Sequence, residues 1–241
     1  MIPTNFQISP LSESAIVLGF GNTIDRTLNT QVLALAEAIQ ASPFPGFTEV
    51  LPAYSSLTVF YDIFAVRKAF PHTPAYHTVR KILLDYITTD ESVFHSGKDM
   101  LVKIPVCYSE VFGWDWKEVY EHTGISREEV IAIHTATIYR VYMMGFLPGF
   151  PYLGGMDSRI ATPRKSQPRL KVEAGSVGIA GEQTGVYPLD SPGGWQVIGK
   201  TPVKLFDPTT NKPVLLKAGD QVQFYEIDED TFYTWNSAKE V

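Results

Sequence analysis

The stretch GFLPGFPYLGGMDSRIATPRKSQPRLKVEAGSVGIAGEQTGVYPLDSPGGWQVIG, residues 145–199, decides how the second half of this chain is built. Its first eleven residues, 145–155, contain four glycines and two prolines, a composition that predicts a loop without helix or regular strand. The apolar side chains between them are expected to fold the loop onto itself as a rigid shelf, which can hold a ligand or a partner protein. These side chains are Phe146, Leu147, Phe150, Tyr152 and Leu153.

A basic segment follows this shelf. Between Arg159 and Lys171 the chain carries five cationic residues and no acidic one, although the formal net charge of the whole chain is −6. The other three cations are Arg164, Lys165 and Arg169. Such a cluster suits one bound anionic group, a carboxylate or a phosphate, better than a nucleic-acid backbone. The alternative is a solvated basic loop that faces an acidic neighbour, and charge alone fits both interpretations.

The stretch closes with SPGGWQVIG, residues 191–199. Ser191, Gly193 and Gly194 lie in a predicted tight turn whose backbone N–H groups can point together toward an anion. Trp195 then begins an apolar run. The turn and the basic segment together form the predicted anion site.

At 241 residues the chain is long enough for one large β-rich domain or two smaller ones, and its 44% hydrophobic content can fill a core. The single cysteine, Cys107, excludes an internal disulfide and is most simply a buried side chain in a reducing compartment. The acidic balance, with a pI near 5.4, argues against binding to nucleic acid or to an anionic membrane. No apolar run reaches the roughly 18 residues of a membrane span, and the N-terminus lacks the pattern of a signal peptide. These features predict a cytoplasmic protein.

The first part of the chain predicts an α+β domain, in which two helices cover one face of an antiparallel sheet. Its expected strands are residues 6–8, 15–18, 49–53 and 56–61. One helix is expected from Asn29 or Thr30 to residue 40, and a second over residues 78–87. Residues 88–99 are polar and lack periodicity, so the domain is predicted to comprise residues 1–97.

Residues 98–241 predict a second, mainly β domain, either a barrel or a sandwich. Its expected strands are residues 101–106, 138–144, 176–180, 184–187, 195–201, 203–206, 214–216 and 221–226. Two short helices are expected after the first strand, each opened by a capping box, Asp115 with Glu118 and Ser126 with Glu129. Gly124 is the expected stop between them, and the second helix is expected to end near residue 134.

Residues 194–201, GWQVIGKT, match the phosphate-loop pattern G-x-x-x-x-G-K-[ST]. Their middle residues alternate like a strand and no helix follows, so we reject a nucleotide-binding loop there. The five histidines and the single cysteine show no spacing typical of a metal site, and no metal is predicted. His134 stands at a helix end just ahead of Arg140, where it could act as a proton shuttle or as a structural helix-cap histidine.

Three segments of the chain resemble one known family. They are YRVYMMGFLPGFPYLGGMD (139–157), ATPRKSQPRLKVEAGSVGIAGEQTGVYPLDSPGGWQVIGKTP (161–202) and KLFDP (204–208). Together they are similar to the KipI/PxpB family, also named allophanate hydrolase subunit 1-like, with specific similarity over about residues 106–208. The resemblance implies an N-terminal α+β domain followed by a mainly β, cyclophilin-like barrel, which agrees with the boundary predicted above.

The resemblance also implies a function. It suggests a component of a bacterial ATP-dependent 5-oxoprolinase, which opens 5-oxo-L-proline to L-glutamate with the partner subunits PxpC (KipA-like) and PxpA (LamB/YcsF-like). One branch of the family inhibits a sporulation histidine kinase, and the paired domains look like half of the carboxyltransferase region of urea carboxylase. The alternatives are therefore a kinase inhibitor and a subunit of an allophanate- or urea-type amidohydrolase.

On this hypothesis the chain adds cations and polar groups to a site shared with a partner subunit, because its sequence shows neither a nucleotide loop nor a carboxylate cluster for magnesium. ATP is the expected co-substrate, bound with a partner subunit, and the chain alone is expected to be inactive. The predicted catalytic residues are His134, Arg140, Gln183 and Tyr187. The predicted substrate- or anion-binding residues are Arg164, Lys165, Arg169, Ser191, Gly193 and Gly194. The predicted partner interface is Phe146, Pro148, Phe150 and Tyr152.

Overall fold

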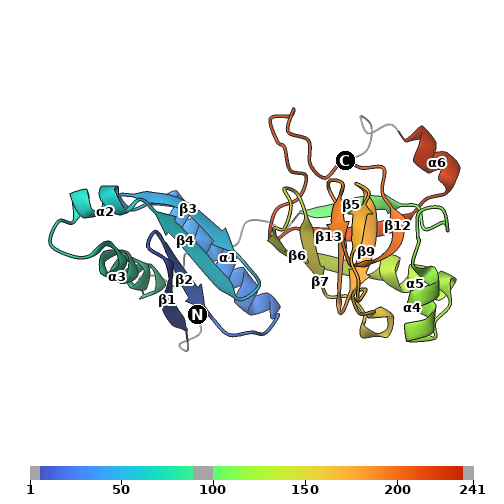
Figure 1. Ribbon diagram of the computed structural model, residues 1–241, viewed down its shortest axis with the longest axis horizontal. Helices are drawn as coiled ribbons and strands as arrows, with labels where there is room; N and C mark the ends of the chain where they lie inside the picture. The colour runs from blue at the N-terminus through green and yellow to red at the C-terminus, as the bar shows by residue number, and fades with distance from the viewer. Residues whose placement is uncertain (1–5, 89–99, 236–241) are drawn as a thin grey trace. The chain divides into compact units, whose positions relative to one another are not determined.

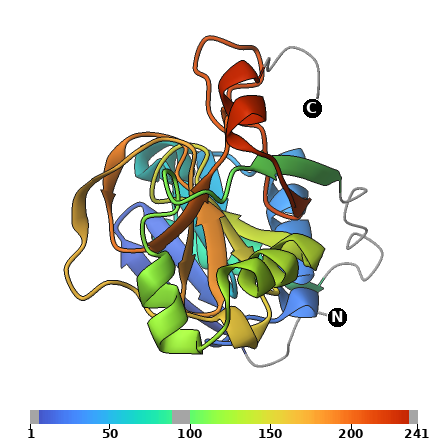
Figure 2. The same cartoon turned by 90° about the vertical axis from the view of Figure 1, so that its right-hand side faces the viewer.

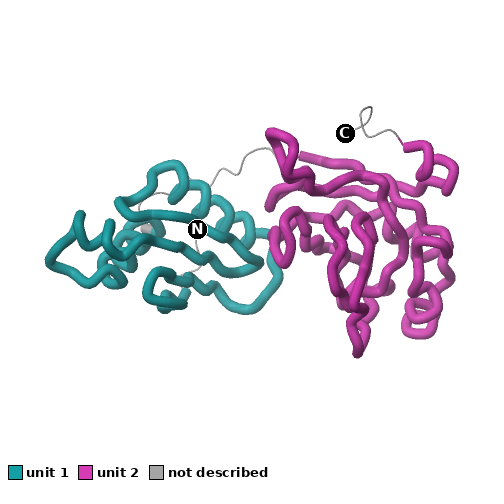
Figure 3. The backbone as a smooth tube through the Cα atoms, turned by 45° about the horizontal axis from the view of Figure 1, so that its top comes forward, with its two compact units in different colours: residues 1–98 teal, residues 99–241 magenta. Residues whose placement is uncertain are grey.

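The computed structural model of the protein describes residues 6–88 and 100–235. The chain divides into two compact units, residues 1–98 (unit 1) and residues 99–241 (unit 2), which Figure 3 shows in different colours. The predicted domain boundary between residues 97 and 98 lies outside the described residues. Each unit contains a hydrophobic core of its own.

Unit 1 is a four-stranded antiparallel sheet with three helices in its described part (Figure 1). In spatial order its strands are β1 (Gln7–Ser12), β2 (Ala15–Gly19), β4 (Ser56–Tyr61) and β3 (Phe47–Pro52). The helices are α1 (Arg26–Ala41), α2 (Ile63–Ala69) and α3 (Ala75–Thr88). Every second residue of β4 is buried, and this apolar face shares one core with α1 and α3. The architecture agrees with the predicted α+β domain.

Several features of unit 1 differ from the prediction. α1 begins at Arg26, earlier than predicted, because the Asp25 carboxylate accepts a hydrogen bond from Leu28 N–H (2.7 Å) and caps the helix. Asn29, a predicted cap, is buried and its side-chain amide donates to the carbonyl of Ala53 (3.3 Å). β1 extends past residue 8, and the short helix α2 has no counterpart in the prediction.

Unit 2 is built on a seven-stranded mixed sheet. In spatial order its strands are β12 (Gln196–Lys200), β9 (Ser176–Ala180), β10 (Gln183–Val186), β7 (Pro151–Gly154), β6 (Ile138–Met144), β13 (Gln221–Glu226) and β5 (Leu101–Val106). β13 and β5 are parallel, and the other neighbouring pairs are antiparallel. The outer strands meet where Cys107 N–H donates to the Lys200 carbonyl (2.8 Å) and Lys200 N–H donates to the Cys107 carbonyl (3.0 Å). The sheet therefore curls into a nearly closed barrel.

Three helices and a small second sheet complete the described part of unit 2. α4 (Trp116–Thr123) and α5 (Arg127–Ala136) lie together at one end, and α6 (Glu229–Thr234) lies at the other, as Figure 2 shows. β8 (Arg169–Val172) pairs with β11 (Ser191–Gly193) outside the barrel sheet, and a 3-10 turn spans Ser158–Ile160. Of the helices in residues 6–88 and 100–235, none combines the length and apolar character that crossing a bilayer requires.

The predicted bounds of β5, β6, β9 and β13 are confirmed, and those of β10 and β12 are off by one residue at each end. The prediction of a strandless loop over residues 145–155 is wrong, because Pro151–Gly154 forms β7. Proline is tolerated there as the first residue of a strand, where its missing N–H matters least. Residues 203–206 and 214–216 form no strands and share a single bridge, between Phe206 and Val214.

Residues 194–201, which match the phosphate-loop pattern, contain strand β12. All of the middle positions are buried, and β12 pairs with β9 along its length. A phosphate loop needs exposed backbone N–H groups at the start of a helix. The rejection of a nucleotide-binding loop at this segment therefore agrees with the structure.

Candidate functional site

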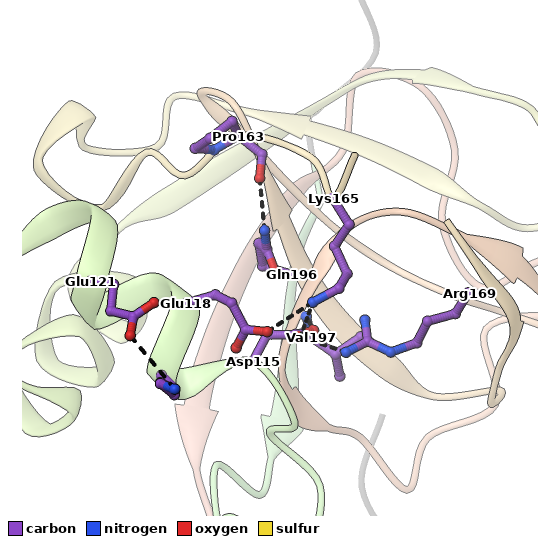
Figure 4. Close-up of polar contacts among 9 residues, drawn as sticks. Asp115, Glu118, Glu121, Pro163, Lys165, Arg169, Gln196 and Val197 are labelled. Atoms are coloured by element: carbon purple, nitrogen blue, oxygen red, sulfur yellow. Dashed lines mark hydrogen bonds and ion pairs between the residues drawn. The ribbon is translucent and has the colours of Figure 1, made fainter. Parts of the chain in front are cut away.

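Asp115 is the centre of an ion cluster in unit 2 (Figure 4). Its side chain is fully buried, and its Oδ1 accepts hydrogen bonds from Lys165 Nζ (2.7 Å) and from Arg169 Nη2. Its Oδ2 accepts from the backbone N–H of Val197 (2.6 Å). Lys165 Nζ also contacts Glu118 Oε1 (3.0 Å). One carboxylate thus connects the start of α4, the basic segment and β12.

Asp115 stays ionised in this environment. Burial raises the pKa of its carboxyl, but the hydrogen bonds from Arg169, Lys165 and Val197 N–H outweigh burial and hold that pKa below its ordinary value. The predicted capping box at this residue is wrong in part, because the Asp115 side chain makes no cap hydrogen bond and turns to the two cations instead. One half of the second predicted box is confirmed, since Ser126 Oγ accepts from Glu129 N–H (3.3 Å). Gly124 ends α4 in the left-handed conformation, as predicted.

The predicted cation cluster is mostly neutralised. Lys165 and Arg169 hold Asp115, so the structure gives these two predicted anion-binding residues a partner within the chain. Arg159 pairs with Asp157 (2.7 Å) and Lys171 pairs with Asp190 (2.8 Å). Within residues 6–88 and 100–235, no carboxylate lies at ion-pair distance from the fifth cation, Arg164. Four of the five cations therefore face acidic residues, as the alternative interpretation of the basic segment expects.

Arg164 lies over an aromatic ring on an anchored piece of backbone. Its guanidinium carbon is 5.8 Å from the ring centroid of Trp195. On one side of Arg164, the Pro163 carbonyl accepts from Gln196 Nε2 (2.9 Å), and on the other, Lys165 N–H donates to the Gly194 carbonyl (2.7 Å). The backbone of Arg164 is therefore held in place from both flanking residues, and its exposed guanidinium lies over Trp195.

The floor under Arg164 is a cluster of four aromatic side chains. Phe150 meets Trp195 edge to face at 5.4 Å and Tyr187 at 5.3 Å, and it lies 5.0 Å from Tyr152. The rings pack closely because glycines make room for them, and a Cβ at Gly193 would collide with the Tyr187 ring. Burial raises the pKa of both tyrosines, and the nearby positive charge of Arg164 opposes that rise. Both hydroxyls thus stay protonated beside a cation.

The shelf loop places its four predicted interface residues differently. Phe146 and Pro148 are exposed, whereas Phe150 is buried in the aromatic cluster and Tyr152 is half-buried in β7. Phe150 and Tyr152 therefore support the surface from below, and of the four predicted interface residues Phe146 and Pro148 are the exposed ones.

His134 belongs to the core of the barrel. It is fully buried, and its Nδ1 lies 2.7 Å from the Tyr108 hydroxyl while its Nε2 lies 2.9 Å from Thr184 Oγ1. The Phe224 ring stacks on it at 4.7 Å. Burial lowers the pKa of His134 to about 3, so the imidazole is neutral. This placement argues against the predicted proton shuttle, because both ring nitrogens are engaged away from solvent. It also differs from the helix-cap alternative, because the partners of those nitrogens are the side-chain hydroxyls of Tyr108 and Thr184.

The remaining predicted site residues are Arg140, Gln183, Ser191, Gly193 and Gly194. Arg140 is buried on β6 and its Nη1 donates to the Gly219 carbonyl (3.4 Å). Gln183 is half-buried at the start of β10. Ser191 and Gly193 form β11 instead of the predicted turn, and neither Gly193 nor Gly194 has the positive φ typical of an anion-binding nest. Of the three predicted arginines, Arg164 alone is left as an anion-binding candidate.

Sequence reasoning missed two residues that build this site. The local pattern assigns Asp115 to a helix cap and Gln196 to an ordinary strand position. The sequence carries no local signal for the first pairing, because other acidic residues lie between Asp115 and the basic segment. Elsewhere in unit 2, a groove of about 1040 Å³ runs beside β5 and β13 and includes none of the predicted site residues. Within the described ranges no group of three or more His, Cys, Asp or Glu side chains is placed to hold a metal ion.

Known relatives match nearly the whole chain. Residues 6–216 match the family model of the carboxyltransferase domain, subdomain C and D. The B subunit of 5-oxoprolinase from Bacillus subtilis (strain 168) is 48% identical over 232 residues, which cover 95% of this chain and 96% of that protein.

Solved structures share the fold. The crystal structure of TTHA0988 aligns with a TM-score of 0.75 at 37% identity, over 89% of this chain and 40% of that longer chain. The Kluyveromyces lactis urea amidolyase aligns with a TM-score of 0.74 over 95% of this chain and 15% of that one, and at 19% identity this likeness shows the fold alone. With a family match over most of its length and a close relative that is matched almost end to end, the chain belongs to the carboxyltransferase subdomain C and D family that includes the B subunits of 5-oxoprolinases.

Proposed function

We propose that this chain is the B subunit of an ATP-dependent 5-oxoprolinase, which opens 5-oxo-L-proline to L-glutamate together with PxpC-like and PxpA-like subunits. The observation that carries the proposal is the 48% identity to a 5-oxoprolinase B subunit along almost the full length of both chains. The proposal includes a cytoplasmic location, where ATP is available, and a cyclophilin-like class for the barrel of unit 2.

The chemistry requires cations. A lactam amide is unreactive, and phosphorylation of its oxygen by ATP would create a leaving group, with positive charges holding carboxylate and phosphate. In this chain Arg164 supplies an exposed guanidinium that no carboxylate of the described residues neutralises. A guanidinium can bind a carboxylate through two parallel hydrogen bonds. We therefore assign Arg164 to the carboxylate of 5-oxoproline, with the hydroxyls of Tyr152 and Tyr187 beneath it as hydrogen-bond donors.

ATP binds elsewhere in this proposal. The segment that matches a phosphate loop contains the buried strand β12. Lys165 and Arg169, two cations that could hold a triphosphate, form ion pairs with Asp115. We place the nucleotide with a partner subunit and expect the isolated chain to be inactive.

The test is reconstitution with the PxpC-like and PxpA-like subunits, followed by an assay for ATP-dependent glutamate release. In the assembled enzyme we expect Arg164→Ala to lower kcat/KM for 5-oxoproline about 10- to 100-fold, the value of a lost hydrogen bond to a charged group. Arg159→Ala is the matched control, because Arg159 is exposed and pairs with Asp157. A wild-type rate for Arg164→Ala would remove Arg164 from the mechanism. Failure of the wild-type chain to assemble or to support glutamate release would remove the proposed function.

The kinase-inhibitor and urea-type alternatives stay hypotheses. Inhibition of a histidine kinase's autophosphorylation by the purified chain, without assembly into an oxoprolinase, would favour the first. Hydrolysis of allophanate or of a urea derivative, without glutamate release, would favour the urea-type alternative.

A further inference from the structure

Gln196 is a buried polar residue beside the segment that carries Arg164. It lies on strand β12, is 6% exposed and pairs across the sheet with Ile179 of β9. Its side-chain Nε2 donates to the carbonyl of Pro163 (2.9 Å), the residue directly before Arg164, as Figure 4 shows. A carbonyl only accepts hydrogen bonds, so the nitrogen of the amide must face Pro163. The barrel sheet thus reaches the Arg164 segment through one side chain.

The fold itself gains little from this glutamine. Its Oε1 is buried and receives no hydrogen bond from any group of residues 6–88 and 100–235. A buried acceptor without a donor destabilises the folded state. The bond to the Pro163 carbonyl is only partly buried, so water can replace the donor there. A methionine at this position would fill nearly the same space without an unpaired acceptor, and the polar side chain therefore points to a role other than stability.

The backbone that carries Arg164 depends on individual hydrogen bonds, because residues 163–168 belong to no helix or strand. Lys165 N–H donates to the Gly194 carbonyl (2.7 Å) and fixes one side of Arg164. The Gln196 amide fixes the other side. A guanidinium binds a carboxylate through two hydrogen bonds only in a narrow range of positions, and a displacement of about 1 Å weakens such binding strongly. Loss of the Gln196 bond therefore affects what Arg164 can bind.

We propose that Gln196 is a positioning residue, which holds Arg164 in the geometry that binds the substrate carboxylate. This inference rests on the proposed function, in which Arg164 binds the carboxylate of 5-oxoproline. Gln196 acts through the backbone of Pro163 and does not touch the substrate. Because Arg164 is assigned to binding and not to bond breaking, loss of the Gln196 amide raises KM and leaves kcat nearly unchanged.

The test is a double-mutant cycle of Gln196→Met and Arg164→Ala in the reconstituted enzyme, with the Tm of each free variant measured by scanning calorimetry. Alone, Gln196→Met should raise KM for 5-oxoproline about 3- to 10-fold, the value of a lost neutral hydrogen bond, while kcat stays within about 2-fold. Combined with Arg164→Ala, it should change kcat/KM by less than about 2-fold, because the residue that Gln196 positions is absent. Gln196→Leu, a second apolar replacement of similar volume, should behave as Gln196→Met does.

Gln223→Met is the matched control. Gln223 also lies on a barrel strand, β13, and its Nε2 also donates to a backbone carbonyl, that of Thr135 (3.4 Å). It belongs to none of the predicted site residues, and its replacement should leave the wild-type KM and kcat.

Each outcome decides a different point. An unchanged KM in the folded Gln196 variants overturns the positioning role and leaves the proposed function standing. An equal loss of kcat/KM with and without Arg164→Ala also overturns it, because the glutamine then acts independently of Arg164. Loss of the fold in both Gln196 variants shows that the side chain serves stability, contrary to the inference. If the wild-type chain supports no glutamate release, the proposed function fails and the positioning role fails with it.

Discussion

The burial of His134 predicts that unit 2 loses stability as the pH falls below about 6.5. The folded chain holds this imidazole neutral with a pKa of about 3, whereas in the unfolded chain it titrates near its ordinary value of 6.5. Between these values the unfolded state binds more protons than the folded state, so the free energy of unfolding decreases as the pH decreases. The stabilisation is fully present above pH 6.5 and is lost progressively toward pH 3.

The magnitude follows from the two pKa values. At pH 5.0 the unfolded imidazole is almost fully protonated and the folded one is neutral, a difference of about 2 kcal/mol relative to pH 7.5. His134→Gln removes the titrating group and can keep one of the hydrogen bonds to Tyr108 or Thr184. The variant should be less stable than the wild type at pH 7.5, but its loss of stability between pH 7.5 and 5.0 should be smaller by about 2 kcal/mol.

Tryptophan fluorescence can follow the unfolding of unit 2 selectively. The four tryptophans of the chain, Trp114, Trp116, Trp195 and Trp235, all lie in that unit. Urea titrations at both pH values give the free energies for the wild type, for His134→Gln and for His122→Gln, in which an exposed histidine of α4 is replaced. His122→Gln should keep the wild-type pH dependence. An equal pH dependence in His134→Gln and in the wild type would show that His134 is not the buried neutral group described here.

Two further predictions concern packing and charge in unit 2. Asp115→Ala should lower the free energy of unfolding by about 3–5 kcal/mol in the same fluorescence assay, because it leaves Arg169 and Val197 N–H without their acceptor and Lys165 with Glu118 alone. Glu121→Ala, which breaks the exposed pair with Lys117, should change the free energy of unfolding by less than about 1 kcal/mol, and equal effects of the two variants would refute the role of Asp115. Gly193→Ala should lower the free energy of unfolding by about 1–3 kcal/mol, because the added Cβ would collide with the Tyr187 ring. Gly194→Ala is the control, since the nearest atom to its added Cβ is 3.5 Å away. An equal loss of stability in both variants would contradict the packing described at Gly193.

Much of the architecture could be predicted from local patterns. Strands β5, β6, β9 and β13 follow runs of apolar and β-branched residues, and such runs are bounded by turn residues that fix their ends. β7 and β11 could not be predicted in the same way, because proline and glycine there have low strand propensity. β7 pairs with β6 and β10, and β11 pairs with β8. The hydrogen bonds of these pairings override the low propensity.

The candidate site was harder to predict because its contacts join distant parts of the chain. The sequence shows that the basic segment contains no acidic residue, but it does not show that Asp115, 50 positions before Lys165, is folded beneath it. The same carboxylate fits a helix-cap pattern, and tertiary contacts override that local option. His134 illustrates the same limit, since its position at a helix end does not reveal that the ring turns into the core.

The charge balance around Arg164 bears on what the site can bind. The basic segment carries five cations, and four carboxylates pair with them, so the segment retains about one uncompensated positive charge. The carboxylates are Asp115, Glu118, Asp157 and Asp190. One charge suits a ligand with a single carboxylate, such as 5-oxoproline, whereas a triphosphate requires several cations or a metal ion to offset its charge. Asp115 and Glu118 together offset Lys165 and Arg169. This balance fits the proposal that the small acid binds at Arg164 and the nucleotide binds with another subunit, and the reconstitution with Arg164→Ala tests the first part of it.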